Sequence, residues 1–485
     1  MNHNMCKVLS LLIVCLTLLL SFGLISCENK KKNPVTPTTE NPGTQPPDDP
    51  EENWDSYLPE ETYGWEDVNI VILRSREWQY FVDDEVEEMS SIESAVFKRN
   101  KAIEERYEVY LNYEVKEQDI AALATICTNS GSYDYDIFSP DYWYGLETQN
   151  AFIDLNQCSQ LHLSNPYWVA GWNNNATVNG KILSAVGYFS LDPIAQEQVL
   201  FFNGALAQAY GYTDLYQKVY DKEWTLDAML GMMKEATQDK DGDTSTLSFE
   251  DQFGLSYDRW GCRAFLYGCG MQLASYKNDA INFQLTSQKN IGIFESVYSF
   301  LKESNAAYDT DGDRYGEKGS QALFTGGRAL FYACPIEAAD VIRGKVGNYG
   351  VLPMPLLNSD QEDYITSLLG TTTCSIFKTC PNIDRAASIL EALCIISYRD
   401  VVPKYYEDCL KFEYQNDPEV AGMLDFIRSR VNVDFMFIND AHFKSICSEP
   451  GYLIRDGKKG EYVSTMASFT NQLPELKEKF LKLFE

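Results

Sequence analysis

Between residues 68 and 138 the sequence alternates short β-branched runs with longer amphipathic segments, and this alternation restricts the fold more than any other feature. Three runs have the length and composition of strands: 68–73, 109–115 and 135–138. Two segments between them place apolar residues at helical spacing: 92–107 and 119–127. A strand–helix–strand–helix–strand order is typical of an open α/β sheet, whose ligands bind beyond the carboxyl ends of its strands.

The rest of the chain continues this mixed pattern on a larger scale. Four later segments are amphipathic at helical spacing: 224–238, 290–304, 384–397 and 418–431. Hydrophobic residues make up 45% of the chain, and a globular part this long exceeds what one core serves, so we expect at least two domains. The net charge of −31 argues against nucleic acid or an anionic membrane surface as a partner.

The N-terminus has the layout of a bacterial export signal. An apolar run from Val8 to Ile25 follows Lys7 and ends at Leu24-Ile25-Ser26-Cys27. This ending resembles the lipobox, which implies that residues 1–26 are a signal peptide and that Cys27 carries a diacylglyceryl group. The alternative is a transmembrane anchor, because the apolar run is just long enough to span a bilayer. We expect a protein held by a lipid at the extracellular face of the cell membrane.

Residues 27–60 are rich in Pro, Thr, Asn and charge, so we expect a disordered tether that leads to the globular part. Ten cysteines follow this tether, and none forms a CxxC motif. An exported chain can pair some of them, whereas free buried thiols suit an anaerobic host. Spacing alone leaves both alternatives open.

Several motifs, in their order along the chain, resemble those of one protein family. They are Val178–Ile182 leading to Gln198–Asn203, Phe324-Thr-Gly-Gly-Arg-Ala-Leu-Phe331, and Tyr349-Gly-Val-Leu-Pro-Met-Pro355. The chain thereby resembles the extracellular solute-binding proteins (family 1) of carbohydrate ABC importers, which include the maltose-binding proteins. Two further stretches, Phe97–Tyr107 and Tyr405–Asp425, resemble a clostridial subgroup of that family.

The resemblance implies an α/β fold of the two-lobed, periplasmic-binding-protein-like type II, with an interlobe cleft and a hinge. Lobe one would hold residues 66–190 and 355–400, and lobe two residues 195–350 and 401–485. The cleft would close around a sugar or oligosaccharide and present it to ABC permease subunits. No bond would be made or broken, no cofactor is expected, and the protein would act as a monomer.

Candidate ligand contacts lie in loops after strands, where carboxylates accept sugar hydroxyls and aromatic rings stack on sugar rings. Ordinary core packing is the alternative for each aromatic residue. The candidates are Arg76, Trp78, Asp141, Tyr142, Trp143, Tyr188, Tyr257, Trp260 and Glu337. Glu337 is included because Cys334-Pro-Ile-Glu337 stands where the family's maltose binders have a tryptophan pair, which argues against a maltodextrin ligand.

Three other function classes remain open at this point. The chain would be a secreted carbohydrate-active enzyme if two carboxylates were suitably spaced, but no hydrolase, zinc or nucleotide motif is found. It would otherwise be a binding module for a sensor receptor, or a binder of peptides, since one fold serves many ligand classes.

The segment from Asp239 to Glu250 resembles an EF-hand calcium loop. Acidic residues stand at positions 1, 3, 5 and 12, and the position-7 carbonyl would come from Ser245. The predicted ligands of a structural Ca²⁺ are Asp239, Asp241, Asp243, Ser245 and Glu250. Position 6 is Thr244 where the turn favours glycine, so a polar turn without metal is the alternative.

Overall fold

The computed structural model describes residues 53–485 without 74–78, 83–87, 117–119, 143–149, 244–246, 311–313 and 406–417. The signal peptide, Cys27 and most of the tether therefore lie outside the described residues. Within those ranges, no helix is both long and apolar enough to cross a membrane.

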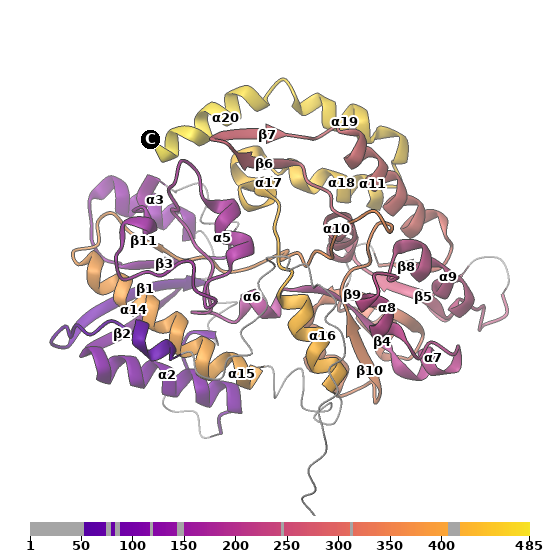
Figure 1. Cartoon of the computed structure of the whole chain (residues 1–485), viewed down its shortest axis with the longest axis horizontal. Helices are drawn as coiled ribbons and strands as arrows, with labels where there is room; N and C mark the ends of the chain where they lie inside the picture. Colours follow the sequence, from indigo (N-terminus) through magenta and orange to yellow (C-terminus); the bar gives the residue numbers. More distant parts are fainter. Residues whose placement is uncertain are drawn as a thin grey trace, which may run out of the picture. The chain divides into compact units, whose positions relative to one another are not determined.

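The first sheet confirms the strand–helix order predicted for the start of the globular part (Figure 1). Its four strands follow the order β11-β3-β1-β2. The central strand β1 (Glu66–Leu73) is parallel to β2 (Val109–Lys116) and to β3 (Ile137–Ser139). A short strand from later in the chain, β11 (Ser375–Ile376), pairs antiparallel with β3.

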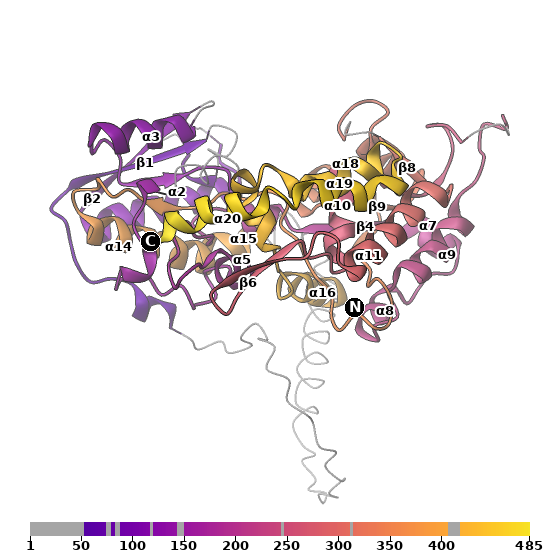
Figure 2. The ribbon, with the colours of Figure 1, turned by 90° about the horizontal axis from the view of Figure 1, so that it is seen from above.

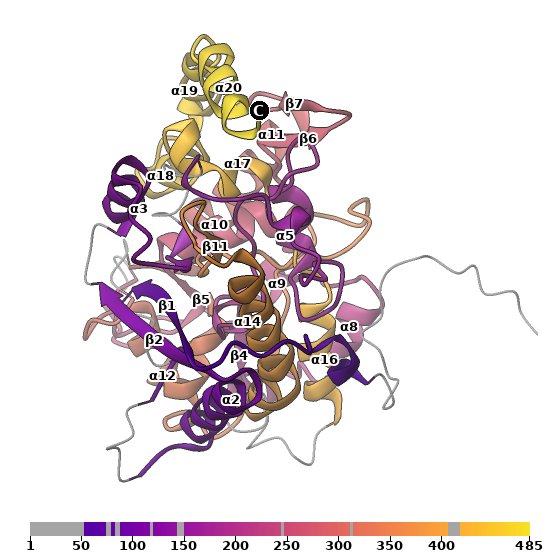
Figure 3. The ribbon, with the colours of Figure 1, turned by 90° about the vertical axis from the view of Figure 1, so that its left-hand side faces the viewer.

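The two faces of β1 are both apolar, because successive side chains of a strand point to opposite faces. Ile70 and Ile72 belong to the main core together with α2 (Ser91–Tyr107), whereas Val71 packs in a second cluster that includes residues of α3 (Ile120–Ser130). Helix α14 (Ile383–Ile396) runs beside α2 (Figure 3). This sheet is therefore covered on both sides, as parallel strands require.

The second sheet has five strands in the order β10-β4-β9-β5-β8. Strands β5 (Phe253–Tyr257), β8 (Ala307–Asp309) and β9 (Ala329–Pro335) are parallel, whereas β4 (Gln198–Asn203) runs antiparallel to β9 and to β10 (Tyr349–Leu352). The helices that accompany this sheet are α7 (Gly204–Ala209), α8 (Leu215–Tyr220), α9 (Leu226–Ala236), α10 (Arg259–Gly268), α11 (Gln288–Tyr298), α12 (Ser320–Thr325), α13 (Ala339–Arg343) and α16 (Pro418–Arg428).

Two connecting segments join the sheets: 140–197 between β3 and β4, which is described except for 143–149, and 353–374 between β10 and β11. The first contains α5 (Ala170–Ala176) and α6 (Asp192–Ala195). The segments lie side by side, because Ala185 pairs with Cys374 and Glu197 pairs with Leu368. The strands of the first sheet fall within the ranges expected for lobe one, and those of the second sheet within the ranges for lobe two except that β10 ends at Leu352, two residues beyond 350; the lobe boundaries themselves stay a prediction.

The last part of the chain forms a separate helical layer with a small hairpin (Figure 2). The hairpin comes from earlier in the chain and pairs β6 (Ala274–Lys277) with β7 (Ala280–Phe283). The helices of this layer are α17 (Phe435–Ile438), α18 (Glu449–Arg455), α19 (Tyr462–Phe469) and α20 (Leu473–Leu481). Outside this layer, a short helix, α15 (Val402–Tyr405), follows α14. The C-terminal layer contacts α10 and also reaches the first connecting segment, where Lys181 Nζ donates to the Glu485 carbonyl at 3.0 Å.

Candidate functional site

The ends of the strands define where a ligand lies in an open α/β fold. In the first sheet, β3 leads directly into Asp141 and Tyr142. In the second sheet, β5 leads into 258–260 and β9 into 336–337. Because β4 is antiparallel to β9, its first residues lie at this same edge. Most of the described ligand candidates therefore do come from strand ends.

Tyr142 has a packing role in this structure. It is fully buried, its ring stacks on Phe437 with 5.1 Å between centroids, and it meets Trp172 edge-on at 5.7 Å. Burial raises its pKa well above the usual value. Tyr142 therefore joins the first sheet to the C-terminal layer, and the preceding Asp141, whose backbone pairs with Thr372, is the more accessible of the two.

The loop after β5 is organised by Asp258. One carboxylate oxygen accepts hydrogen bonds from the backbone N–H groups of Trp260 and Gly261 at 3.0 Å, which caps α10. The other oxygen accepts a hydrogen bond from Arg314 Nε at 2.7 Å. These contacts fix the first turn of α10, and they hold Trp260 half-buried at the strand edge.

Tyr257 and Tyr188 are both buried in this conformation. The Tyr257 hydroxyl donates to Asp309 at 3.1 Å, within the second sheet. Tyr188 lies under the guanidinium of Arg428, 5.7 Å from its ring centroid, and burial raises its pKa to about 12. These two aromatic candidates therefore have packing partners within the protein. Such packing is the alternative to ligand contact that the sequence left open.

Glu337 and Glu197 bring carboxyl groups to the edge of the second sheet. Gln196 Nε2 donates to Glu337 at 2.8 Å. The neighbouring Glu197 is fully buried, and neither of its carboxylate oxygens has a hydrogen-bond partner among the described residues. Burial raises the pKa of Glu197 well above its usual value, an effect that Arg428 opposes and Asp425 reinforces. A buried carboxyl group of this kind is held in its neutral form.

Other polar atoms on neighbouring elements are also buried without a hydrogen-bond partner. Most buried polar groups in proteins are paired, so an unpaired one is a place for water or a polar ligand, and several of those found in this chain lie on or beside β4, β9 and α10. The residues concerned are Glu197, Gln198, Arg263, Arg314, Tyr332 and Asp440.

These residues are not among the candidates named from the sequence, although three of them carry a signal there. Gln196-Glu-Gln198 places three polar residues at the start of the apolar strand β4. Arg263 interrupts the otherwise apolar and small residues of Gly261–Gly268. A polar residue inside an apolar run needs either a partner or a function, because its burial is costly.

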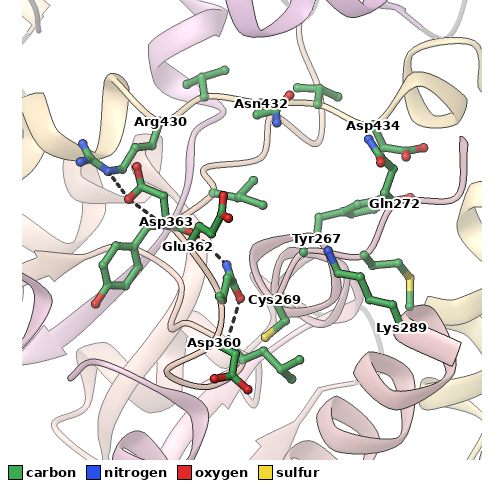
Figure 4. A pocket seen from close by; sticks show the side chains of 18 of the residues that line it. Tyr267, Cys269, Gln272, Lys289, Asp360, Glu362, Asp363, Arg430, Asn432 and Asp434 are labelled. Carbon is green, nitrogen blue, oxygen red and sulfur yellow. Dashed lines mark hydrogen bonds and ion pairs between the residues drawn. The ribbon is translucent and has the colours of Figure 1, made fainter. Parts of the chain in front are cut away.

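A large pocket lies elsewhere and contains none of the predicted ligand residues. Its volume is about 830 Å³, and it lies between the end of α10 and the segments 357–365 and 429–434. Figure 4 shows Arg430 paired with Asp363 on one wall, with Lys289 and Gln272 on the other. This pocket is distinct from the strand ends, so we do not assign the ligand to it.

The loop predicted to bind calcium brings three carboxylates together. Oxygens of Asp239, Asp241 and Asp251 lie within 4.8 Å of one another. Asp251 also accepts hydrogen bonds from the backbone N–H groups of Lys240 and Ser248, which lower its pKa. Glu250 points elsewhere, since its carboxylate pairs with Arg328 at 3.0 Å. The third carboxylate of this group is thus Asp251 and not the predicted Glu250, and Asp243 donates its backbone N–H to Asp241 at 3.0 Å.

Five predicted site residues lie outside the described residues. They are Cys27, Arg76, Trp78, Trp143 and Ser245.

Comparison with known proteins identifies the fold. The fold is mixed α/β and matches two-lobed, MalE-like periplasmic binding proteins. The sugar-binding protein MalE from Xanthomonas citri has a TM-score of 0.59 at 12% identity and covers 86% of this chain and 99% of its own. A cyclo/maltodextrin-binding protein complexed with maltotetraose has a TM-score of 0.57 at 14% identity, with coverage of 85% and 97%.

Maltose-bound MalE3 from T. maritima has a TM-score of 0.53 at 15% identity and covers 85% of this chain and 99% of its own. At such identities the likeness concerns the fold alone. No family model and no curated protein matches the chain.

Proposed function

We propose that this chain is an extracellular solute-binding protein, anchored to the cell membrane by a lipid, that captures a sugar or oligosaccharide and delivers it to an ABC permease. The observation that carries the proposal is the set of buried, unpartnered polar atoms on elements that end at the strand edges. Two-lobed proteins of this fold with bound sugars are known, such as the maltose and maltotetraose complexes. The fold alone does not fix the ligand, so the site has to support it.

The chemistry of the site suits a saccharide. Sugar hydroxyls donate hydrogen bonds to carboxylates and accept them from guanidinium groups. Asp141 and Glu337 supply carboxylates at strand ends, and Arg314 supplies a guanidinium in the loop that follows β8. Trp260 offers a half-buried ring for stacking, and the Asp258 cap fixes its position. The other predicted contacts, Arg76, Trp78 and Trp143 among them, stay predictions. Since only differential binding shifts a hinge equilibrium, the ligand has to contact both lobes when they close.

The test is a thermal-shift screen of residues 28–485 against mono- and oligosaccharides, followed by calorimetry on each hit. A ligand at 100 times its dissociation constant adds about 2.7 kcal/mol of stability. Trp260→Ala should weaken binding about 10-fold or more, because a stacked ring is lost. The matched control is Trp65→Ala, which removes a half-exposed tryptophan next to β1. If no saccharide shifts the melting temperature, or if both variants bind alike, the proposed site is refuted.

Lipid anchoring rests on the sequence Leu24-Ile25-Ser26-Cys27. Intact-mass analysis of the membrane-extracted protein should show a chain that begins at Cys27 and carries acyl groups. An unmodified chain that retains residues 1–26 would point instead to a transmembrane anchor. Delivery to a permease predicts that cells lacking this protein lose uptake of the sugar found in the screen.

We also propose that the acidic loop holds a structural Ca²⁺. The support is the approach of Asp239, Asp241 and Asp251, which are hard oxygen ligands of the kind that calcium prefers. Several of these oxygens already accept backbone N–H groups of the loop, so the turn is formed by the protein itself. Calcium should raise the melting temperature in EDTA-treated protein, and Asp251→Asn should remove that rise. An equal rise in the variant would exclude this site.

A further inference from the structure

Arg263 is a buried cation for which the described residues supply no counter-ion. It lies one turn into α10, only 4% of its surface is exposed, and its Nε is fully buried without a hydrogen-bond partner. No ion pair or hydrogen bond joins its side chain to any of the described residues. Burying a charge without a partner costs several kcal/mol, so a residue of this kind is retained for a reason other than stability.

The surroundings of Arg263 are built to hold its side chain in place. The guanidinium lies 4.8 Å from the ring centroid of Trp260 and 5.3 Å from that of Tyr452. A Cβ added at Gly451 would lie 3.0 Å from Arg263 Cγ and 3.2 Å from its Nε, so this glycine provides the space for the arginine stem. Two aromatic rings and a glycine therefore fix the guanidinium, while none of them neutralises it.

A buried acceptor lies in the same region. Asp440 receives the Cys447 thiol on one oxygen at 2.8 Å, while its other oxygen is buried without a hydrogen-bond partner. Burial raises the pKa of Asp440, and Arg263 opposes this effect through its charge. The charges of the two side chains therefore interact, although no ion pair between them is found within the described residues. A cationic donor and an acceptor are both left unsatisfied near each other.

This pair lies where elements of the two sheets approach one another. The charge of Arg263 also acts on Tyr142, which directly follows β3 of the first sheet. Tyr142 stacks on Phe437, and Phe437 in turn meets Tyr267 of α10 at 5.8 Å. Arg263 itself lies on α10, which begins at the edge of the second sheet, about one turn beyond the half-buried Trp260.

We propose that Arg263 binds the carboxylate of an acidic sugar, so that the ligand of this protein is a saccharide containing uronic acid. The inference rests on the proposed function and narrows its ligand class. A planar guanidinium matches a carboxylate with two parallel hydrogen bonds, and the ligand supplies the missing counter-ion. Asp440 accepts a neighbouring hydroxyl, and Trp260 stacks on the sugar ring. Because the carboxyl group of Asp440 lies within electrostatic range of Arg263, a singly charged group fits better than a phosphate with two charges.

The test is calorimetry on residues 28–485 with saccharides that differ only at C6. The probes are glucuronate against glucose, galacturonate against galactose, and trigalacturonate against its fully methyl-esterified form. A carboxylate should bind at least 100-fold more tightly than its neutral counterpart, because a neutral group leaves Arg263 unpaired. Arg263→Gln should abolish this preference, and Arg263→Lys should restore part of it. The matched control is Arg106→Gln, which removes the same charge from an exposed position on α2, away from Trp260.

The stability of the ligand-free variants provides a second readout. Because Arg263 is buried without a counter-ion, Arg263→Gln should leave the melting temperature of the ligand-free protein unchanged or raise it. A marked fall in that temperature would show that the arginine is a structural element and would overturn the inference.

The outcomes separate this inference from the proposed function. If neutral sugars bind as tightly as acidic ones and Arg263→Gln binds them like the unmodified protein, the acidic class is wrong while sugar binding stands. If a sulfated disaccharide binds and no uronate does, the carboxylate assignment is wrong. If no saccharide binds at all, the proposed function fails together with this inference.

Discussion

Replacing Glu197 with glutamine should stabilise the protein, and the gain should grow as the pH rises. The carboxyl group is fully buried directly before β4, and within the part of the chain that the structure describes neither oxygen has a hydrogen-bond partner. Burial raises its pKa well above the usual value, and the nearby Arg428 only partly opposes this. Folding therefore forces this group to remain protonated at pH values where the unfolded chain is ionised.

The sign and size of the effect follow from proton linkage. In the unfolded chain a glutamate has a pKa of about 4.3. Above this pH the unfolded state releases a proton that the folded state retains, so the free energy of unfolding falls as the pH rises. The slope is at most about 1.4 kcal/mol per pH unit and ends once the raised folded-state pKa is passed. Glutamine does not ionise, so the advantage of Glu197→Gln widens across this range.

Urea unfolding of the two proteins between pH 5 and pH 8 measures this difference directly. A useful contrast is Glu391→Gln, because Glu391 is equally buried but accepts hydrogen bonds from Tyr167, His162 and Trp168 at 2.6, 2.9 and 3.0 Å. That variant should lose about 2–4 kcal/mol, since donors are left unpaired. If Glu197→Gln is less stable than the unmodified protein and the difference does not change with pH, Glu197 is ionised beside Arg428 and the reasoning is wrong.

Three further substitutions test the packing around the site by urea unfolding. Gly231→Ala should stabilise the protein by about 0.5–1 kcal/mol, since Gly231 is inside α9 with open space around its Cα; an unchanged midpoint would contradict this. Gly187→Ala should destabilise it by about 1–3 kcal/mol, because the new Cβ would lie 2.6 Å from the Trp168 ring; a neutral effect would show that the connecting segments can shift. Asp258→Ala should cost about 3–5 kcal/mol by removing the cap of α10 and the partner of Arg314, and a loss below about 1 kcal/mol would refute the importance of that ion pair.

Much of the architecture could be predicted from local patterns. The strands β1, β2 and β3 and the helices α2 and α14 lie within a few residues of their predicted positions. In each of these elements the apolar residues recur at the spacing typical of a helix or a strand, and this spacing can be recognised within a short run of consecutive residues. The two-lobed class followed from the order of motifs, and the structural comparison confirms it. The strand pairings, such as β11 with β3, could not be predicted, because they join residues far apart in the chain.

The site was predictable only in part. The sequence placed Asp141, Trp260 and Glu337 after strands, and the structure does place them there. It did not decide which aromatic residues pack in the core, and Tyr142 and Tyr257 prove to be buried. The sequence shows residue types but not their neighbours, and burial depends on neighbours supplied by distant segments.

The sequence by itself determined the export signal pattern with Cys27 and the acidic loop, because each is encoded within a short continuous stretch, and it determined the fold class through the order of local motifs along the chain. Only the tertiary structure decided that Asp251 lies beside Asp239 and Asp241 and that Glu197 has no hydrogen-bond partner among the described residues. The same holds for Arg263 and Asp440, which a helix of the second sheet and the C-terminal layer bring together. The cost of an unpaired buried charge is set by everything that surrounds it, and those surroundings exist only once the chain has folded.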